Sequence, residues 1–201
     1  FFAIFVFLYL LAVYKKNFFI AFYKSGLQGF AAGFFLSLGF SAYVFAMYNT
    51  TVANTLFIIT TETLFLAIFG FIFLKEKINL ATFIAIILGM LGVLIIVGSS
   101  LSTQTDQQLI GNLVAFTMPI SFAILIIIIR KNSKVDMVPS QFIAATFATV
   151  TAFLVVVSSS SEFSLIGSKL YMSKHDFVLA FIAGVFQVGF GFILITIGSK
   201  N

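Results

Sequence analysis

The sequence contains no cysteine and only one histidine. It can therefore form neither a disulfide nor a thiolate metal site, and His175 lies in a polar stretch between apolar runs. Few other side chains of this composition bind transition metals well. We accordingly expect neither a metal ion nor a cofactor.

Charged residues are also scarce, at 8% of 201 residues, whereas hydrophobic residues make up 61% and the mean hydropathy is +1.19. A soluble domain must cover its surface with polar groups, which this composition does not supply. The sequence therefore predicts an integral membrane protein. The net charge of +5 comes from short clusters between apolar runs rather than from a continuous basic face, so nucleic acid is not an expected partner.

A helix of roughly twenty apolar residues crosses a bilayer core of about 30 Å. Six stretches are long enough, and they cover residues 27–48, 50–74, 78–98, 108–129, 138–157 and 177–198. A seventh, residues 1–14, is apolar but too short, and we interpret it as the end of a span that begins upstream. We therefore expect the sequence to be a fragment of a longer, all-α membrane protein, with about seven of its helices present here.

Lysine and arginine alternate between the linkers. The linkers that contain Lys15, Lys75 and Arg130 are basic, whereas residues 48–51 and 99–107 contain neither lysine nor arginine. Because basic linkers stay on the cytoplasmic side, this pattern predicts a multi-pass protein of the cell inner (cytoplasmic) membrane with Phe1 and the linker 99–107 outside.

A short internal repeat relates two of the apolar stretches. Residues 30–35 match residues 181–186 at Phe, Ala, Gly and Phe, and Gly-Phe recurs at 39–40 and 189–190. On our count of the spans the two copies have opposite orientations in the membrane, as in transporters built from inverted repeats. Small residues at every fourth position, such as Ala81, Ala85 and Gly89, predict faces on which helices pack closely.

Several motifs resemble the EamA-like family of the drug/metabolite transporter (DMT) superfamily: TVANTL at 51–56, FLKEK at 73–77, LGMLGV at 88–93, and GN at 111–112 followed by SFA and RK. The resemblance implies a ten-helix bundle of two inverted five-helix repeats, with a substrate cavity near the midplane. Residues 1–98 would then be helices two to five of the first repeat, 99–107 an external linker, and 108–201 helices six to eight of the second repeat.

Glu62 is the only charged residue inside any long apolar stretch. A charge at that depth costs a few kcal/mol, so its side chain should face the interior of a bundle or a wet cavity. Members of the family usually carry a proline in the middle of helix four, which by alignment falls at Thr63. This sequence has threonine instead of the proline that would bend the helix, and the carboxylate of Glu62 lies next to this position.

On a continuous helix, Asn54, Thr55 and Thr61 share the face of Glu62. One interpretation is a cavity wall on which Glu62 binds an amine, or stays protonated at rest and couples transport to proton movement. The other is an interhelical hydrogen bond that only holds the bundle together. Gln187, between two glycines of the last span, and Asn112 are further substrate-binding candidates, with packing as the alternative.

Two further residues are expected to act on structure. Pro119 could bend the stretch 108–129, because proline cannot donate a backbone hydrogen bond. Glu76 lies between two lysines at the predicted cytoplasmic end of its span, and we expect it to pair with nearby cations or helix ends rather than with substrate.

The predicted function is a permease that moves a small organic metabolite, such as an amino acid or amine, by alternating access between two states. An oligomeric channel lined by a ring of Glu62 side chains is the main alternative, with a non-transporting scaffold behind it. A retinal protein is not expected, since no lysine lies in a span to form its Schiff base. An enzyme is not expected either, since no span pairs histidines or glutamates as a membrane hydrolase requires. The expected partners are a small-molecule substrate and the lipid bilayer, and a homodimer remains open.

Overall fold

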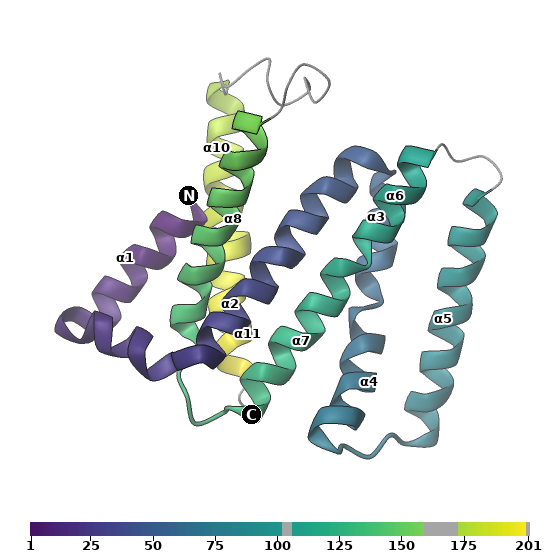
Figure 1. Ribbon diagram of the computed structural model, residues 1–201, viewed down its shortest axis with the longest axis horizontal. Helices are drawn as coiled ribbons and strands as arrows, with labels where there is room; N and C mark the ends of the chain where they lie inside the picture. The colour runs from purple at the N-terminus through teal and green to yellow at the C-terminus, as the bar shows by residue number, and fades with distance from the viewer. Residues whose placement is uncertain (102–105, 159–172, 200–201) are drawn as a thin grey trace. The chain divides into compact units, whose positions relative to one another are not determined.

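The computed structural model describes residues 1–101, 106–158 and 173–199, and within these ranges all regular secondary structure is helical (Figure 1). Each of the seven apolar stretches predicted from the sequence forms helix, which confirms that expectation. The elements in chain order are α1 (Phe2–Tyr14), η1 (Lys15–Asn17), α2 (Phe18–Asn49), α3 (Val52–Thr60), α4 (Glu62–Leu74), α5 (Leu80–Leu101), α6 (Asp106–Ala115), α7 (Thr117–Lys131), α8 (Val138–Ser158), α10 (Lys174–Ile182), the π-helix η3 (Ala183–Phe190) and α11 (Gly191–Gly198).

Four helical stretches of the described residues are long and apolar enough to cross a membrane, namely Phe2–Asn49, Val52–Leu74, Asp106–Lys131 and Lys174–Gly198. Two shorter apolar stretches, Leu80–Gly92 and Val138–Leu154, accompany them. These lengths support a multi-pass helical membrane protein. The ten-helix arrangement and the inverted repeat stay predictions, and part of the linker 99–107 lies outside the described residues.

Helix starts in this chain are stabilised by short polar side chains. The Thr51 hydroxyl accepts a hydrogen bond from the backbone amide of Asn54 at 3.2 Å and so caps α3. In the same way Asn79 accepts from the amide of Thr82 at 2.7 Å, and Ser173 accepts from the amide of the third residue of α10. Because the first amides of a helix have no partner within it, each such cap adds about 1 kcal/mol and sets where the helix begins.

The chain forms two compact units. The first contains Phe1–Phe34 and Asn132–Asn201, and the second contains Phe35–Lys131. Each unit therefore draws residues from both predicted repeats, and the repeat boundaries at 98 and 108 stay a prediction.

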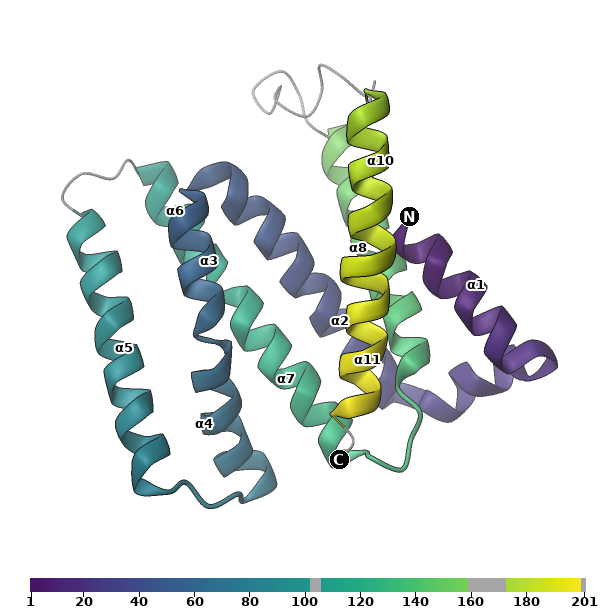
Figure 2. The ribbon, with the colours of Figure 1, turned by 180° about the vertical axis from the view of Figure 1, so that it is seen from behind.

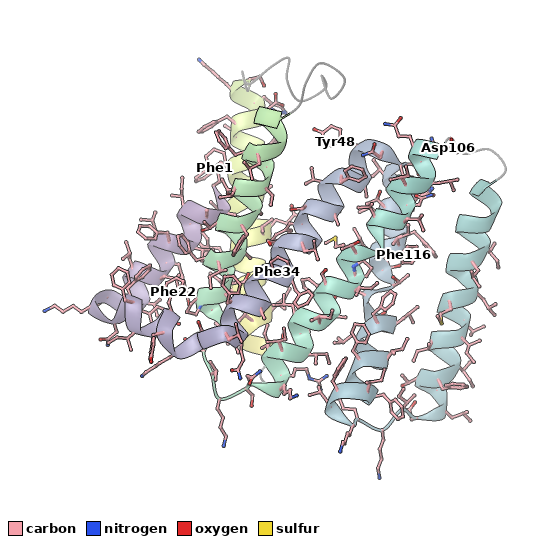
Figure 3. All side chains as sticks on the ribbon, in the orientation of Figure 1. Phe1, Phe22, Phe34, Tyr48, Asp106 and Phe116 are labelled. Carbon is pink, nitrogen blue, oxygen red and sulfur yellow. The ribbon has the colours of Figure 1, made fainter. Side chains whose placement is uncertain are left out.

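The first unit is built around α1 and α8. Val6 and Leu10 of α1 are buried together with Val138 and Ile193, and aromatic side chains such as Phe22 surround them (Figure 3). The Tyr14 hydroxyl donates a hydrogen bond to the carboxylate of Asp136. The other oxygen of that carboxylate accepts from the first amide of α8 at 3.1 Å. The end of α1 is thereby tied to the start of α8.

Close contact between helices in the first unit depends on glycines. A Cβ added at Gly184 would lie 2.9 Å from the Cβ of Phe1, and one at Gly189 would overlap the ring of Phe5, so α1 packs directly on the backbone of η3. A Cβ at Gly33 would lie 2.7 Å from the carbonyl oxygen of Ser140 in α8. Such small-residue faces are a usual way for helices to pack in membranes.

The second unit pairs two helical stretches. α4 packs mainly against α7, α3 packs against α6, and α5 contacts both α3 and α4 (Figure 2). Gly89 of α5 meets the Leu64 side chain, since an added Cβ would lie 2.7 Å from it. This contact confirms the expected packing role of Gly89. At the far end of α4, the guanidinium of Arg130 forms an ion pair with Glu76, which confirms that Glu76 has a cationic partner.

The basic linker after α1 differs from the sequence-based expectation, because most of it is helical. Residues 15–17 form a single tight turn, and the chain then continues as helix from Phe18 until Gly26 interrupts α2 with φ of +54°. The physical reason lies in the composition, since residues 18–23 are nearly all apolar and the helix buries part of them against α1 and α8.

Candidate functional site

The span that contains Glu62 is interrupted in its middle. α3 ends at Thr60 and α4 begins at Glu62, with Thr61 between them. The backbone amide of Thr61 donates to the carbonyl oxygen of Ile58 at 3.1 Å, and the Thr61 hydroxyl donates to the same oxygen at 2.6 Å. The continuous helix assumed from the sequence is therefore wrong at this residue.

Threonine hydroxyls account for this interruption in the absence of a proline. Besides Thr61, the hydroxyl of Thr60 donates to the carbonyl oxygen of Phe57 at 2.6 Å, and that of Thr63 donates to the carbonyl oxygen of Thr60 at 3.3 Å. A hydroxyl can donate a hydrogen bond to a backbone carbonyl oxygen that has lost its helical amide partner. Such bonds lower the energetic cost of interrupting a helix inside a membrane. Threonine hydroxyls thus accompany a break near the position where the family usually has a proline.

A second interruption lies in the stretch that pairs with the first. Phe116 separates α6 from α7, and its amide donates to the carbonyl oxygen of Leu113 at 3.3 Å. Pro119 is the third residue of α7 and cannot donate to the carbonyl oxygen of Ala115, four residues earlier. The bend expected from Pro119 is therefore present, and it lies just before the proline.

The two interruptions lie next to each other in the second unit. Ile58, beside the first break, is buried in one cluster with Ala115 and Ala46, and Phe116 packs against that cluster. Figures 1 and 2 both show α3 and α4 running alongside α6 and α7. Interrupted helices in contact are the usual framework of substrate and ion sites in transporters.

Glu62 is the first residue of α4, and its side chain is half-buried. Among the described residues, no side chain or backbone group donates a hydrogen bond to its carboxylate and no cation pairs with it. The amides at the start of a helix carry a partial positive charge, which favours a carboxylate at this position. Among the described residues, the backbone amides at the start of α4 are thus the only groups found to stabilise a charged Glu62.

The other candidates on this stretch differ in what they can still bind. Thr55 and Thr61 are buried, and both hydroxyls donate to carbonyl oxygens of their own stretch, Thr55 to Thr51 at 3.1 Å. A ligand could therefore use only their acceptor lone pairs. Asn54 is half-buried, and no described residue contacts its side-chain amide through a hydrogen bond. It keeps both donors and an acceptor for a ligand.

Asn112 has a structural role in the second unit. It is buried, and its side-chain oxygen accepts from the Thr50 hydroxyl at 2.6 Å, which ties α6 to the turn between α2 and α3. Gln107 donates to the side-chain oxygen of Asn49 at 3.1 Å in the same region. Gly111 lies so close to this turn that an added Cβ would be 2.8 Å from the carbonyl carbon of Asn49. This polar cluster holds the end of α6 in place.

Gln187 belongs to the first unit, whereas the other five candidates belong to the second. It lies in the middle of the π-helix η3 and is exposed in the described part of the chain. π-Helical turns are rare and are often found at functional sites. Gly184, three residues before Gln187, packs against α1, and this close packing explains why a glycine is needed there.

One buried polar pair was missed by the sequence analysis. Gln141 of α8 is fully buried, and its side-chain nitrogen donates to the Thr196 hydroxyl at 2.6 Å. Thr196 in turn donates to the carbonyl oxygen of Phe192 at 2.7 Å. The side-chain oxygen of Gln141 has no partner among the described residues. The sequence does show a polar amide, Gln141, within the apolar stretch 138–157. A search for polar side chains inside spans, as was made for Glu62, would have identified it.

The chain has several apolar helices long enough to cross a membrane, so it is a multi-pass helical membrane protein. Two of its helical stretches are interrupted where they pack together, an arrangement that is common in transporters. Residues 1–98 match the model of the EamA-like transporter family, which is consistent with a member of the DMT superfamily. No curated protein and no solved structure matches the chain.

Proposed function

We propose that the protein is a permease that moves a small organic metabolite, of the amino acid or amine type, across the cytoplasmic membrane by alternating access. Glu62 binds the cationic group of the solute or a coupled proton. The observation that carries this proposal is the half-buried carboxylate of Glu62, which has no hydrogen-bond donor or cation among the described residues and begins α4 at the break in its span.

The physical argument concerns charge balance. A carboxylate within a membrane span is costly unless a positive charge or donor compensates it. The start of α4 supplies only part of that compensation. An ammonium group or a proton would supply the rest, and its release would return the site to the uncompensated state. A group that alternates between these two states is suited to binding and releasing a solute.

Other side chains complete the proposed site. Asn54 has an unused amide that could bind a carboxylate or hydroxyl of the solute, and Thr61 offers acceptor lone pairs next to Glu62. Thr55 lies one turn before Ile58 on the same buried side. Gln187 belongs to the first unit and stays a separate candidate, from the second predicted repeat. Asn112 acts on the site indirectly, because it fixes the end of α6.

The test is Glu62→Gln in proteoliposomes made from the full protein. Glutamine keeps the shape of the side chain and removes its charge, so we expect the protein to fold normally while solute uptake falls by at least about tenfold, or loses its dependence on pH, since one lost charge-assisted hydrogen bond is worth about 1.5–3 kcal/mol. Glu76→Gln is the matched control, because Glu76 already has an ionic partner at the end of α4. Unchanged uptake and an unchanged pH profile in Glu62→Gln would reject the role of Glu62.

The same carboxylate keeps the oligomeric channel as a second candidate, because copies of Glu62 could form a charged ring. The two functions differ in their kinetics. A permease shows saturable uptake and counterflow of solute, whereas a channel shows unsaturable single-channel currents. Currents without counterflow would replace the permease by the channel.

A further inference from the structure

Residues 15–27, which we call the basic-aromatic segment, connect α1 to the main part of α2 in the first unit. Both ends of this segment have backbone conformations in the left-handed half of φ, with φ of +46° at Lys15 and +54° at Gly26. Between them residues 18–25 form a short helix that turns away from the directions of α1 and α8 (Figures 1 and 2). The two breaks therefore separate this helix from the helices on either side.

The breaks have a geometric purpose. The apolar stretch Phe2–Asn49 contains 48 residues, far more than the roughly twenty that one crossing needs. The chain has to reverse direction within it, and the three lysines of the basic-aromatic segment mark where it does so. These lysines belong to the linker that the charge pattern predicts to be cytoplasmic. The segment is thus expected at a membrane surface.

One face of the segment is fixed against the first unit. Ala21 and Ser25 are buried, and the rings of Phe18 and Phe22 pack against the core around α1 and α8. The ring centroid of Phe22 lies 5.9 Å from that of Phe142 in α8. These contacts determine which side chains of the segment point outward.

The outward face is unusually apolar for its surroundings. Phe19 is 82% exposed, Tyr23 88% and Leu27 82%, which are the three highest values among the exposed large apolar residues of the described chain. Phe19 and Tyr23 are four residues apart and therefore share one helix face. A soluble environment would not favour these side chains, whereas a membrane interface favours tyrosine, and interfacial helices bury phenylalanine and leucine on their apolar face.

The charges of the segment identify what covers this face. Lys15, Lys16 and Lys24 are exposed at its two ends, and no carboxylate among the described residues forms an ion pair with them. We propose that the basic-aromatic segment is an interfacial anchor that binds anionic phospholipid headgroups of the cytoplasmic leaflet, with Phe19 and Tyr23 inserted at headgroup level and the three lysines on the lipid phosphates. Apolar insertion and lysine–phosphate attraction together give such helices their affinity for membranes.

The depth of the segment can be measured directly, because the 201 residues contain no tryptophan. In the full protein, Tyr23→Trp places a fluorophore on the proposed interfacial face. Leu88→Trp, at a side chain of α5 that is 63% exposed, provides the matched probe within a span. We expect lipids brominated near the headgroup to quench the probe at 23 more strongly, and lipids brominated deep in the chain to quench the probe at 88. Equal depths for the two probes, or no quenching at 23, would overturn the proposal.

The lipid preference requires a second experiment. Protein purified from vesicles of mixed phosphatidylglycerol and phosphatidylcholine is analysed for the phosphatidylglycerol that it retains. A lysine near an anionic surface contributes about a fivefold gain in affinity, so Lys15→Gln/Lys16→Gln/Lys24→Gln should reduce this preference by more than about tenfold. The control Lys75→Gln/Lys77→Gln/Lys134→Gln removes the same number of exposed positive charges from the other two predicted cytoplasmic linkers. It should reduce the preference clearly less, because these lysines are divided between two linkers rather than gathered in one segment. Equal losses in both variants would show that net charge alone attracts the lipid, which would reject the anchor.

Discussion

Lys75 and Glu76 end α4 in a way that combines an unfavourable backbone conformation with a favourable contact. Lys75 has φ of +56° and ψ of +32°, and the amides of both residues reach back to the carbonyl oxygen of Gly70. Glycine at 70 leaves room for the Glu76 carboxylate, since an added Cβ would lie 2.7 Å from it. The ion pair with Arg130 is partly exposed, so it contributes at most about 1 kcal/mol. Geometry and the pair together position the end of α4 on α7.

Lys75→Gly should stabilise the protein by about 0.5–1 kcal/mol. Only glycine adopts the left-handed conformation without a steric penalty, and this conformation is the usual end of a helix. The measurement is unfolding of the purified protein in detergent. Lys77→Gly serves as the control, because Lys77 has no positive φ and should gain nothing. An equal gain from both changes would show that loss of charge, rather than backbone conformation, is responsible.

Among the helices, the interrupted stretches α3–α4 and α6–α7 matter most for function. In one stretch threonine hydroxyls supply the hydrogen bonds at the break, and in the other a proline lies just after it. Both breaks occur where the stretches pack on each other around Ile58 and Ala115. The interruption also moves Glu62 from the interior of a helix to its first turn, where the helix dipole favours a carboxylate.

The position of the break predicts that proline is accepted at residue 63. Thr63 is the second residue of α4, and the first turn of a helix tolerates proline because its amides have no partner within the helix. Thr63→Pro should therefore change the free energy of unfolding by no more than about 1 kcal/mol. Phe69→Pro, in the middle of α4, should cost about 3 kcal/mol or more. Thermal unfolding in detergent compares the two, and an equally large loss from both would mean that the span is a continuous helix.

For the whole molecule, the charges of the linkers predict how the chain is threaded through the membrane. The basic linkers at Lys15, Lys75 and Arg130 predict three cytoplasmic turns, and the linker that ends at Asp106 is predicted to lie outside. The EamA match over residues 1–98 supports a transporter with several spans.

Because the sequence has no cysteine, single-cysteine variants report this threading without background. Asp106→Cys should react with a membrane-impermeant maleimide added to intact cells. Lys16→Cys and Lys77→Cys should react only after the cells are permeabilised. All three positions are exposed in the structure, so accessibility within the protein is not limiting. The reverse labelling pattern would invert the predicted topology.

Sequence alone determined the membrane class, the seven helical stretches and the isolated charge at Glu62, because span length, hydropathy and charge placement are local properties that composition records. Tertiary structure decided the rest. The break at Thr61 depends on hydroxyl–carbonyl hydrogen bonds and on packing against α6, more than fifty residues away in sequence terms, and neither is visible in a periodic pattern. The buried pair of Gln141 and Thr196, the helix within the basic linker and the outward face of Phe19 and Tyr23 likewise depend on which helices meet.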